Sequence, residues 1–201
     1  MDRVEAVQRL LKVFSQHGYE GATLSRISEA TGLGRASLYH HFPNGKKEMA
    51  EAVLNYVNQW FKATVLEPLY SEGQPVERIQ AMNTSLSQFY NCGRDACLLA
   101  VFTLGDSNDL FRPQVQQALN AWIDGLTQVL TEAELDEVQA GSVVSRRSTL
   151  DSEQARKRAE DAVMQIQGAL VLTRALGDTA LFERVLQQLP VKLMDVVCEH
   201  G

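Results

Sequence analysis

The sequence predicts an all-α fold, and three observations lead to this expectation. Apolar residues recur at spacings of three and four along most of the chain, which is the period of a helix with one buried face. No segment alternates between apolar and polar residues as a half-buried strand does. Glycine and proline clusters divide the pattern into helices of ordinary length. We expect two helical domains, residues 1–46 and residues 47–201.

The first three expected helices are short and have clear ends. The first should stop at Gly18, since glycine readily adopts the left-handed conformation that ends a helix. The second should begin after the N-cap Thr23 and close at Gly32. The third should begin after Gly34 and end at the break formed by residues 43–45. The apolar stripe of the first helix consists of Val7, Leu10, Leu11 and Phe14.

Longer apolar segments follow in the remainder of the chain. They cover residues 46–66, 76–90, 96–104, 113–133, 152–176 and 179–199. Pro113 suits the first turn of its helix because proline lacks an N–H group, and that group is unpaired in a first turn. Residues 139–152 are polar and indicate a linker.

The segment before Leu176 is apolar on most of its faces. A helix with this pattern is buried on more than one side, which a hairpin at the end of a chain cannot achieve alone. We therefore interpret the last two helices as half of a four-helix dimer interface within residues 155–198. The residues expected at this interface are Met164, Gly168, Leu172, Ala175, Val185, Leu189 and Leu193.

Composition places the chain among ordinary folded proteins, with 45% hydrophobic and 22% charged residues in 201. It contains no run of about 18 apolar residues, so no membrane span is expected. The N-terminus lacks the pattern of an export signal, so we expect a cytoplasmic location. Three cysteines are too few and too scattered for a disulfide framework.

Charge is distributed unevenly along the chain. Residues 1–50 carry a net charge of +2, whereas residues 51–201 carry −8. A mildly basic head on an acidic body can approach phosphate with the head alone. The margin is small enough that chance explains it equally well.

Residues 23–47 have the layout of a helix-turn-helix, in which a glycine turn joins a capped helix to a short recognition helix. Arg35 starts the second helix, where contacts to base edges are expected, and arginine can bond guanine bidentately. Hydroxyl, imidazole and lysine side chains nearby can contact bases or phosphates, as can the free N–H groups at the helix starts. The candidate DNA-binding residues are Thr23, Ser25, Arg35, Ser37, Tyr39, His40, His41, Lys46 and Lys47.

The alternative to DNA binding for the whole stretch is a plain helical hairpin. For His40 and His41 individually, the alternative is simple solvation without a phosphate contact. A metal site at these histidines is not expected, because adjacent helical positions point about 100° apart and no partner lies one turn away. No catalytic constellation, glycine-rich phosphate loop, HExxH or GxSxG is present. We expect a protein that is not an enzyme and has no cofactor.

The same stretch resembles the TetR family of bacterial transcriptional repressors over residues 5–52. The matching residues are Thr23, Ile27, Ala30-Thr31-Gly32, Leu38-Tyr39-His40-His41-Phe42 and Lys46. Residues 42–46, FPNGK, are similar to the LmrA-like branch, whereas Gly34 departs from the Ser or Thr often found before the recognition helix. The resemblance implies an all-helical homodimer that binds a double-stranded, pseudo-palindromic operator and releases it when a small ligand binds the C-terminal domain.

The nature of that ligand is open. Aromatic and methionine side chains favour a small hydrophobic or aromatic effector, although each of these residues taken singly is more commonly core, and only as a group are some expected to line a cavity. The candidate effector-binding residues are Phe61, Met82, Phe89, Tyr90, Phe102, Trp122 and Met164. A second hypothesis is a thiol- or electrophile-sensing repressor that uses Cys92 and Cys97, which flank Arg94.

Overall fold

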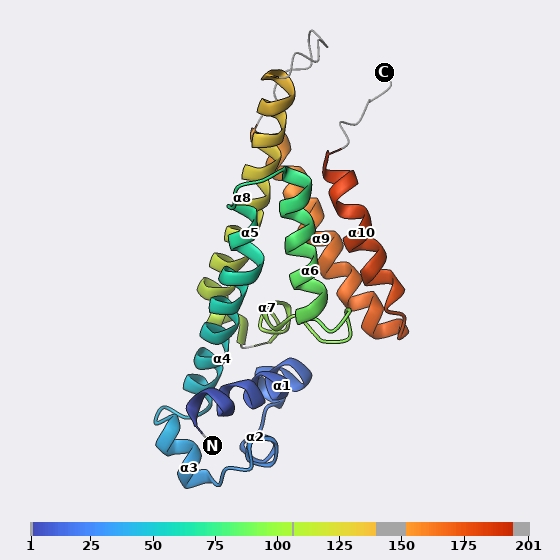
Figure 1. Ribbon diagram of the computed structural model, residues 1–201. Helices are drawn as coiled ribbons and strands as arrows, with labels where there is room; N and C mark the ends of the chain where they lie inside the picture. The colour runs from blue at the N-terminus through green and yellow to red at the C-terminus, as the bar shows by residue number, and fades with distance from the viewer. Residues whose placement is uncertain (1, 106, 140–151, 195–201) are drawn as a thin grey trace. The chain divides into compact units, whose positions relative to one another are not determined.

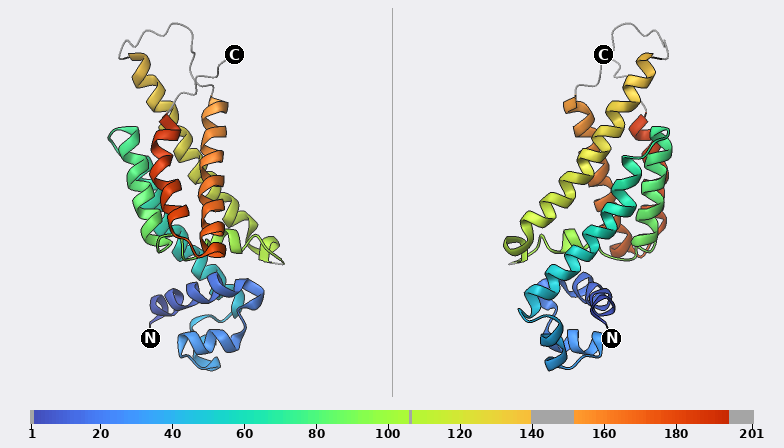
Figure 2. Two further views of the ribbon diagram at one scale, coloured as in Figure 1. Left: turned by 90° about the vertical axis from the view of Figure 1, so that its right-hand side faces the viewer. Right: turned by 60° about the vertical axis from the view of Figure 1, so that its left-hand side comes forward.

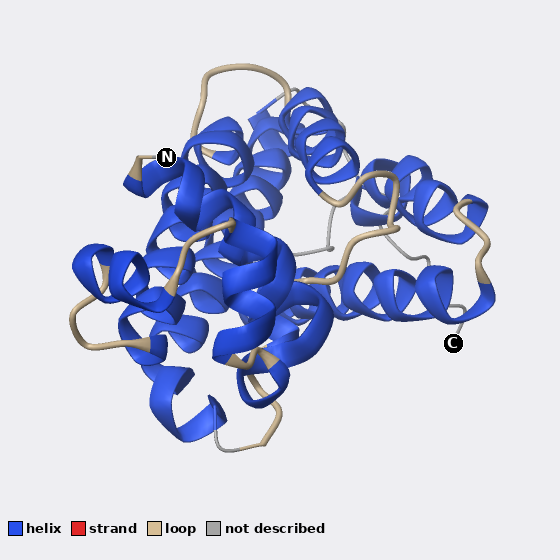
Figure 3. Ribbon diagram, turned by 90° about the horizontal axis from the view of Figure 1, so that it is seen from below, coloured by secondary structure: helices blue, strands red, loops and turns tan. Residues whose placement is uncertain are grey.

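The computed structural model describes residues 2–105, 107–139 and 152–194, and every regular element in these ranges is helical (Figures 1 and 3). The all-α prediction is therefore confirmed. In chain order the elements are α1 (Arg3–Gly21), α2 (Leu24–Thr31), α3 (Arg35–His41), α4 (Lys46–Phe61), the π-helix η1 (Lys62–Leu66), α5 (Glu67–Leu69), α6 (Pro75–Phe89), α7 (Leu98–Val101), α8 (Ser107–Gln139), α9 (Ser152–Leu176) and α10 (Ala180–Met194). Residues 140–151 of the predicted linker and the last five residues of the predicted helix 179–199 lie outside the described ranges.

Packing divides the chain into two compact units. The N-terminal unit comprises Met1–Phe61 and Ala96–Ala118, and the C-terminal unit comprises Lys62–Asp95 and Leu119–Gly201. The sequence places a boundary after residue 46 because the helix-turn-helix ends there. Packing additionally groups α4 and residues 96–118 with the first three helices.

In the N-terminal unit, α1 packs against α2, α4 and α7. Gly18 interrupts the regular helix at φ 67° and ψ 179°, at the position where the sequence predicts a stop. Beyond it, Tyr19 joins an aromatic cluster that reaches the segment after α7. The ring centroid of Tyr19 lies 5.3 Å from that of Phe111, and Phe102 lies 5.8 Å from Phe14. This cluster fixes the C-terminal end of α1 against residues distant in sequence.

Helix α8 begins earlier than the sequence predicts. The prediction places the helix start at Pro113, but α8 starts at Ser107 and Pro113 lies inside it. The physical reason is a cap from a distant part of the chain, because the backbone N–H of Ser107 donates to Glu20 Oε1 at 2.9 Å. With a first-turn N–H satisfied in this way, helix can form ahead of the proline.

The C-terminal unit is built on α6, α9 and α10, which lie side by side (Figures 1 and 2). Its core contains fully buried side chains that include Met82, Trp122 and Phe182. Gly93 has a φ of 87°, and a Cβ built there would lie 2.8 Å from the Cβ of Phe182. Only glycine fits this turn, because both its backbone conformation and its close approach to α10 exclude a side chain.

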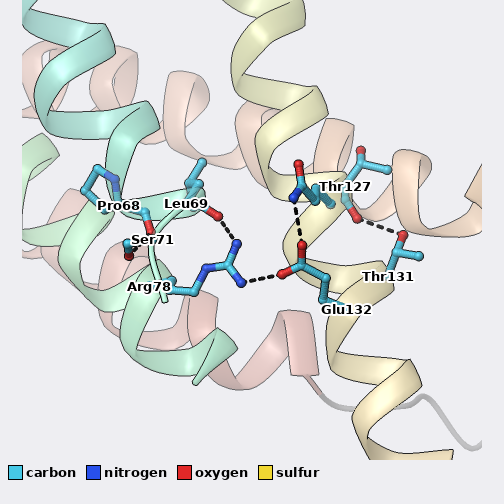
Figure 4. A network of polar contacts seen from close by, with 8 residues as sticks. Pro68, Leu69, Ser71, Arg78, Thr127, Thr131 and Glu132 are labelled. Carbon is cyan, nitrogen blue, oxygen red and sulfur yellow. Dashed lines mark hydrogen bonds and ion pairs between the residues drawn. The ribbon is translucent and has the colours of Figure 1, made fainter. Parts of the chain in front are cut away.

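A buried arginine connects three helices of the C-terminal unit (Figure 4). Arg78 of α6 is 7% exposed, and its Nη1 and Nη2 donate to the Glu132 carboxylate of α8 and to the Leu69 carbonyl oxygen of α5. Gln128 Nε2 donates to the other oxygen of Glu132 at 2.7 Å. The hydrogen bond from Arg78 lowers the pKa of Glu132, outweighing the opposing effect of burial.

Candidate DNA-binding site

Helix α2 begins and ends at the two local signals that the sequence predicts. The side-chain oxygen of Thr23 accepts the N–H of Arg26 at 3.3 Å and caps α2. Gly32 adopts the left-handed conformation, with φ 71° and ψ 9°, and its N–H donates to the carbonyl oxygen of Ser28 at 2.8 Å. Both predicted caps are confirmed.

The chain leaving α2 is held by Thr31, which is 2% exposed. Its hydroxyl donates to the Ile27 carbonyl oxygen at 2.7 Å and accepts the N–H of Leu33 at 3.3 Å. From α1, Arg9 Nη1 donates to the Thr31 carbonyl oxygen at 3.2 Å. These bonds set the direction in which the chain enters α3.

Helix α3 has one buried edge and one exposed edge. Leu38 is 1% exposed and Phe42, which caps the helix, is fully buried, so both anchor α3 to the core of the unit. Four predicted DNA-binding residues lie on the exposed surface: Arg35, Ser37, Tyr39 and His40. His41 is half-buried. The predicted contacts thus come from side chains that solvent or a ligand can reach.

The two helices border a small hollow on this surface. Its volume is about 300 Å³, and Ser25 and Ser28 of α2 face Arg35 and Leu38 of α3 across it. The Ser25 hydroxyl and the Arg35 guanidinium therefore line one concave spot, whereas the Ser28 hydroxyl already donates to the Leu33 carbonyl oxygen. Donors of this kind suit phosphate oxygens and base edges.

Gly34 precedes α3 without a side-chain cap. Its φ of −68° and ψ of 162° are extended values that any residue adopts, and a Cβ added there would meet no atom within 4 Å. The departure from Ser or Thr is therefore not enforced by the backbone or by packing.

The two lysines at the start of α4 have different surroundings. Lys46 is half-buried, and its Nζ donates to the Tyr19 carbonyl oxygen at 3.0 Å and lies 4.4 Å from the centre of the Tyr19 ring. Lys47 is exposed, and its Nζ lies 3.8 Å from a carboxylate oxygen of Glu51. Lys47 can reach a phosphate as it stands, whereas Lys46 already binds α1.

Tyr19 is a supporting residue that the sequence did not single out. Burial raises its pKa, and the neighbouring charges of Glu20 and Glu51 raise it further. Its role depends on contacts with residues 46, 102 and 111. The apolar pattern of α1 ends before Gly18, so no local signal could have identified it.

The candidate effector-binding residues do not form one group. Phe61 and Phe102 belong to the N-terminal unit and are buried there. In the C-terminal unit, Met82 and Trp122 are fully buried and touch, with 3.2 Å between Trp122 Nε1 and Met82 Sδ. Tyr90 is 2% exposed, and its neighbour Phe89 is half-buried. Met164 is 61% exposed on α9, away from this core.

The candidate dimer residues separate into surface and core positions. Met164, Gly168, Leu172 and Ala175 are exposed on α9, and Val185 of α10 is half-buried. Leu189 and Leu193 are 1% and 5% exposed, so their side chains pack inside the protomer. Two further large apolar side chains extend the exposed surface of α9, Val171 and Leu176. The exposed apolar face is therefore centred on α9.

The two candidate thiols differ in their surroundings. Cys97 is buried, and Cys92 is half-buried with a φ of 56° and its Sγ 3.8 Å from Ser87 Oγ. The described residues contain no group of three or more His, Cys, Asp or Glu arranged to hold a metal ion. No helix in the described ranges is long and apolar enough to cross a membrane.

Family comparisons match both parts of the chain. Residues 8–53 match "Bacterial regulatory proteins, tetR family", and residues 75–188 match "Transcriptional regulator LmrA/YxaF-like, C-terminal domain". The HTH-type transcriptional regulator LmrA of Bacillus subtilis is 26% identical over 142 residues, which cover 69% of this chain and 76% of LmrA. The HTH-type transcriptional repressor AcnR of Corynebacterium glutamicum is 48% identical over 46 residues, or 23% of either chain.

Solved structures share the fold over nearly the whole chain. A TetR transcriptional regulator from Chloroflexus aurantiacus superposes with a TM-score of 0.73 at 20% identity, covering 96% of this chain and 94% of that one. The regulator FadR of Bacillus subtilis, solved in complex with stearoyl-CoA, superposes with a TM-score of 0.64 at 17% identity, covering 94% and 97%. At these identities the likeness concerns the fold.

Proposed function

We propose that this protein, which belongs to the tetR family of bacterial regulatory proteins and has an LmrA/YxaF-like C-terminal domain, represses transcription as a dimer on a pseudo-palindromic operator. The observation that carries the proposal is the exposed edge of α3. It follows a turn fixed by Thr23, Thr31 and Gly32, and it presents Arg35 to solvent while Leu38 holds the helix to the core. A short recognition helix with this support enters the major groove of DNA in helix-turn-helix proteins.

Base reading is assigned to the N-terminal end of α3. Arg35 is the residue that can bond guanine bidentately, while Ser37 and Tyr39 offer a hydroxyl and a ring edge. Thr23, Ser25, His40, His41 and Lys47 are assigned to phosphates, which fix the register of the protein on the duplex. Lys46 joins them only if its bond to the Tyr19 carbonyl opens.

Dimerisation is assigned to the exposed apolar face of α9. Leu172 and its neighbours Val171 and Leu176 are 53%, 60% and 69% exposed, which is unusual for three large apolar side chains so close together on one helix. Gly168, one turn before, has open space where a side chain would be, so a second helix can approach closely. Two heads paired by symmetry must match half-sites about 34–36 Å apart, or a multiple of one helical turn.

Release is assigned to a small hydrophobic or aromatic effector that contacts Met82, Tyr90 and Trp122. The FadR structure was solved in complex with stearoyl-CoA, a ligand with a long apolar acyl chain on a charged coenzyme A group, which supports an apolar contact in the proposed effector. Because Met82 and Trp122 are fully buried, an effector that displaces them would favour a different arrangement of the unit. In a Trp60→Phe background, where Trp122 is the remaining tryptophan, a candidate effector should quench the fluorescence, and adding Met82→Ala should abolish this quenching. Equal quenching with and without Met82→Ala would reject the assignment.

The operator is tested by selecting bound fragments from a genomic DNA pool. We expect an inverted repeat whose half-site spacing is one helical turn or a multiple, and weak competition by random duplex. Random duplex that competes as well as the selected fragment would reject sequence-specific repression.

The dimer is tested by placing a charge on the apolar face. Leu172→Glu should give a monomer in light scattering, since an unpaired carboxylate cannot be buried in an apolar interface without a large loss of free energy. Leu104→Glu is the matched control, because Leu104 is 66% exposed but belongs to the N-terminal unit. An unchanged mass for Leu172→Glu would exclude this face as the interface.

A further inference from the structure

A polar groove lies between α6 and α10 in the C-terminal unit. The groove has a volume of about 560 Å³, which is within the range of small-molecule sites. Six polar side chains line it: Gln80, Asn83, Thr84, Ser87, Glu183 and Gln187. None of the residues predicted to contact the hydrophobic effector is among its lining residues.

The groove owes one feature to Pro190. Proline lacks an N–H, so Pro190 cannot make the helical hydrogen bond to the Leu186 carbonyl oxygen four residues earlier in α10. Asn83 of α6 supplies the missing donor, with Nδ2 at 2.7 Å from that oxygen. This bond fixes which way the Asn83 amide points, since a flipped amide would place two oxygens against each other.

The same bond leaves the other end of the amide without a partner. Asn83 is 6% exposed, and its Oδ1 is buried without a hydrogen-bond partner among the described residues. An acceptor removed from water in this way is unfavourable until a donor reaches it. Asn83 lines the groove, so a rigid acceptor in a fixed orientation lies beside the groove, just beneath its accessible surface.

Charge in the groove has one sign. Glu183 is the only charged lining residue, and no ion pair involving it occurs among the described residues. The Thr84 hydroxyl already donates to the Gln80 carbonyl oxygen at 2.9 Å. Leu186 and Pro190 add an apolar wall. The lining thus offers acceptors, one negative charge and a small apolar surface.

We propose that this groove binds a small organic cation that carries several N–H donors on a short apolar body, such as an amidinium, a guanidinium or a primary ammonium. One N–H donates to Asn83 Oδ1, which a small movement of the lining side chains uncovers, and the positive charge lies near the Glu183 carboxylate. The apolar body packs against Leu186 and Pro190. The site is separate from the hydrophobic effector site, and its occupation does not depend on the repressor function.

The test uses benzamidinium chloride and the full-length protein, with binding measured by calorimetry. Benzamidinium should bind once per chain, and benzoate, which has the same ring but the opposite charge, should not bind. Glu183→Gln should weaken benzamidinium binding about tenfold, the change expected from losing one charge-assisted hydrogen bond. Glu77→Gln is the matched control, because it removes a carboxylate from α6 outside the groove.

The acceptor is tested by a variant that keeps α10 satisfied. Asn83→Leu alone removes the donor to Leu186, but Asn83→Leu combined with Pro190→Ala restores a helical N–H to that carbonyl. This double variant should fold, as judged by circular dichroism, and should bind benzamidinium at least tenfold more weakly than Pro190→Ala alone, which has the same wall but keeps the Asn83 acceptor.

Three results would overturn the proposal. They are absent benzamidinium binding in the wild-type protein, equal binding of benzoate, and equal affinities in Glu183→Gln and Glu77→Gln. A groove occupied by a second copy of the chain would give the first of these results. Duplex binding by the same samples, measured without benzamidinium, is independent of all three, so failure here is distinguishable from failure of the repressor proposal.

Discussion

The α2–α3 turn and the C-terminal unit are organised by hydrogen bonds of different range. In the turn that presents α3, the caps at Thr23 and Gly32 and the bonds of the Thr31 hydroxyl join residues two to four positions apart, and one longer bond reaches the Thr31 carbonyl oxygen from Arg9 of α1. In the C-terminal unit, the Arg78 side chain bonds Glu132, 54 positions away, and Asn83 bonds Leu186, 103 positions away. The presentation of the candidate DNA-binding edge is thus encoded mainly by local contacts, with one bond from α1, whereas the C-terminal unit depends on distant partners.

This difference has a physical origin. A recognition helix must keep its functional side chains in water, so its geometry can depend only on caps and on one anchored edge. A unit that buries polar groups must satisfy them, and in a helical bundle the remaining partners come from other helices. The N-terminal turn should therefore tolerate changes at its exposed surface, and the C-terminal unit should not tolerate changes at its buried polar groups.

The largest expected effect is the loss of Arg78. Arg78→Met should lower the free energy of unfolding by about 3 kcal/mol, since it leaves the Leu69 carbonyl unpaired and the Glu132 carboxylate without its cation. Urea denaturation measures this difference. Arg94→Met, at an exposed position of the same unit, is the control and should stay within about 0.5 kcal/mol of wild type. Equal stability of the two variants would contradict the contrast between the units.

The second largest expected effect is a loss of base discrimination at unchanged stability. Arg35→Ala should lose about 1–3 kcal/mol of discrimination at one base pair of each half-site while leaving the unfolding transition unchanged. Affinities for the selected operator and for its single-base variants measure this loss. An equal reduction for every duplex would instead assign Arg35 to phosphate.

Acid should remove the stability that the Arg78–Glu132 ion pair gives the C-terminal unit, because the pKa of Glu132 is lowered in the folded state. A carboxylate with a lowered folded pKa contributes stability above its unfolded pKa and loses that contribution as pH falls through the folded value. The contribution should be about 1 kcal/mol or less, because the Glu132 side chain is 40% exposed and solvent screens it. Wild type should therefore exceed Glu132→Gln in stability at neutral pH, and the gap should close below pH of about 4.5. A gap that is independent of pH would exclude the ion pair as its cause.

The sequence predicts the features of this fold that depend on local contacts, and it misses those that depend on distant partners. Thr23 and Gly32 are caps with a local mechanism, and both lie where the sequence predicts them. The start of α8 was predicted wrongly, since the carboxylate that caps Ser107 belongs to Glu20 in α1. Neither the burial of Arg78 nor the interior position of Leu189 has a local signature. The sequence pattern therefore predicts helices and their caps, and the prediction fails where a hydrogen-bond partner comes from another helix.

The two adjacent lysines at the start of α4 test whether structural and DNA-contacting side chains can be distinguished within the N-terminal unit. Lys46→Met should lower stability by about 1 kcal/mol, because it removes a charged hydrogen bond to the Tyr19 carbonyl oxygen and a cation above the Tyr19 ring. Lys47→Met should leave stability unchanged and reduce the salt dependence of duplex binding by about one phosphate contact. Denaturation and affinity at several salt concentrations measure the two quantities. If Lys46→Met leaves stability unchanged and lowers only the salt dependence, the bond from Lys46 to Tyr19 contributes little to stability, and Lys46 contacts a phosphate when DNA binds.

The smallest expected effect is the most local one. Gly34→Ser places a hydroxyl at the N-cap of α3, where the backbone already has extended angles and a Cβ meets no atom within 4 Å. A serine cap in place of glycine should stabilise the unit by a few tenths of a kcal/mol, or about 0.3 kcal/mol. Gly34→Ala, which fits equally but cannot cap, is the matched control. Because the hydroxyl also lies next to Arg35, Gly34→Ser should bind duplex slightly more tightly than Gly34→Ala. If both variants lose stability alike, the open space beside Gly34 is not available in solution, and the presentation of α3 depends on more than its local caps.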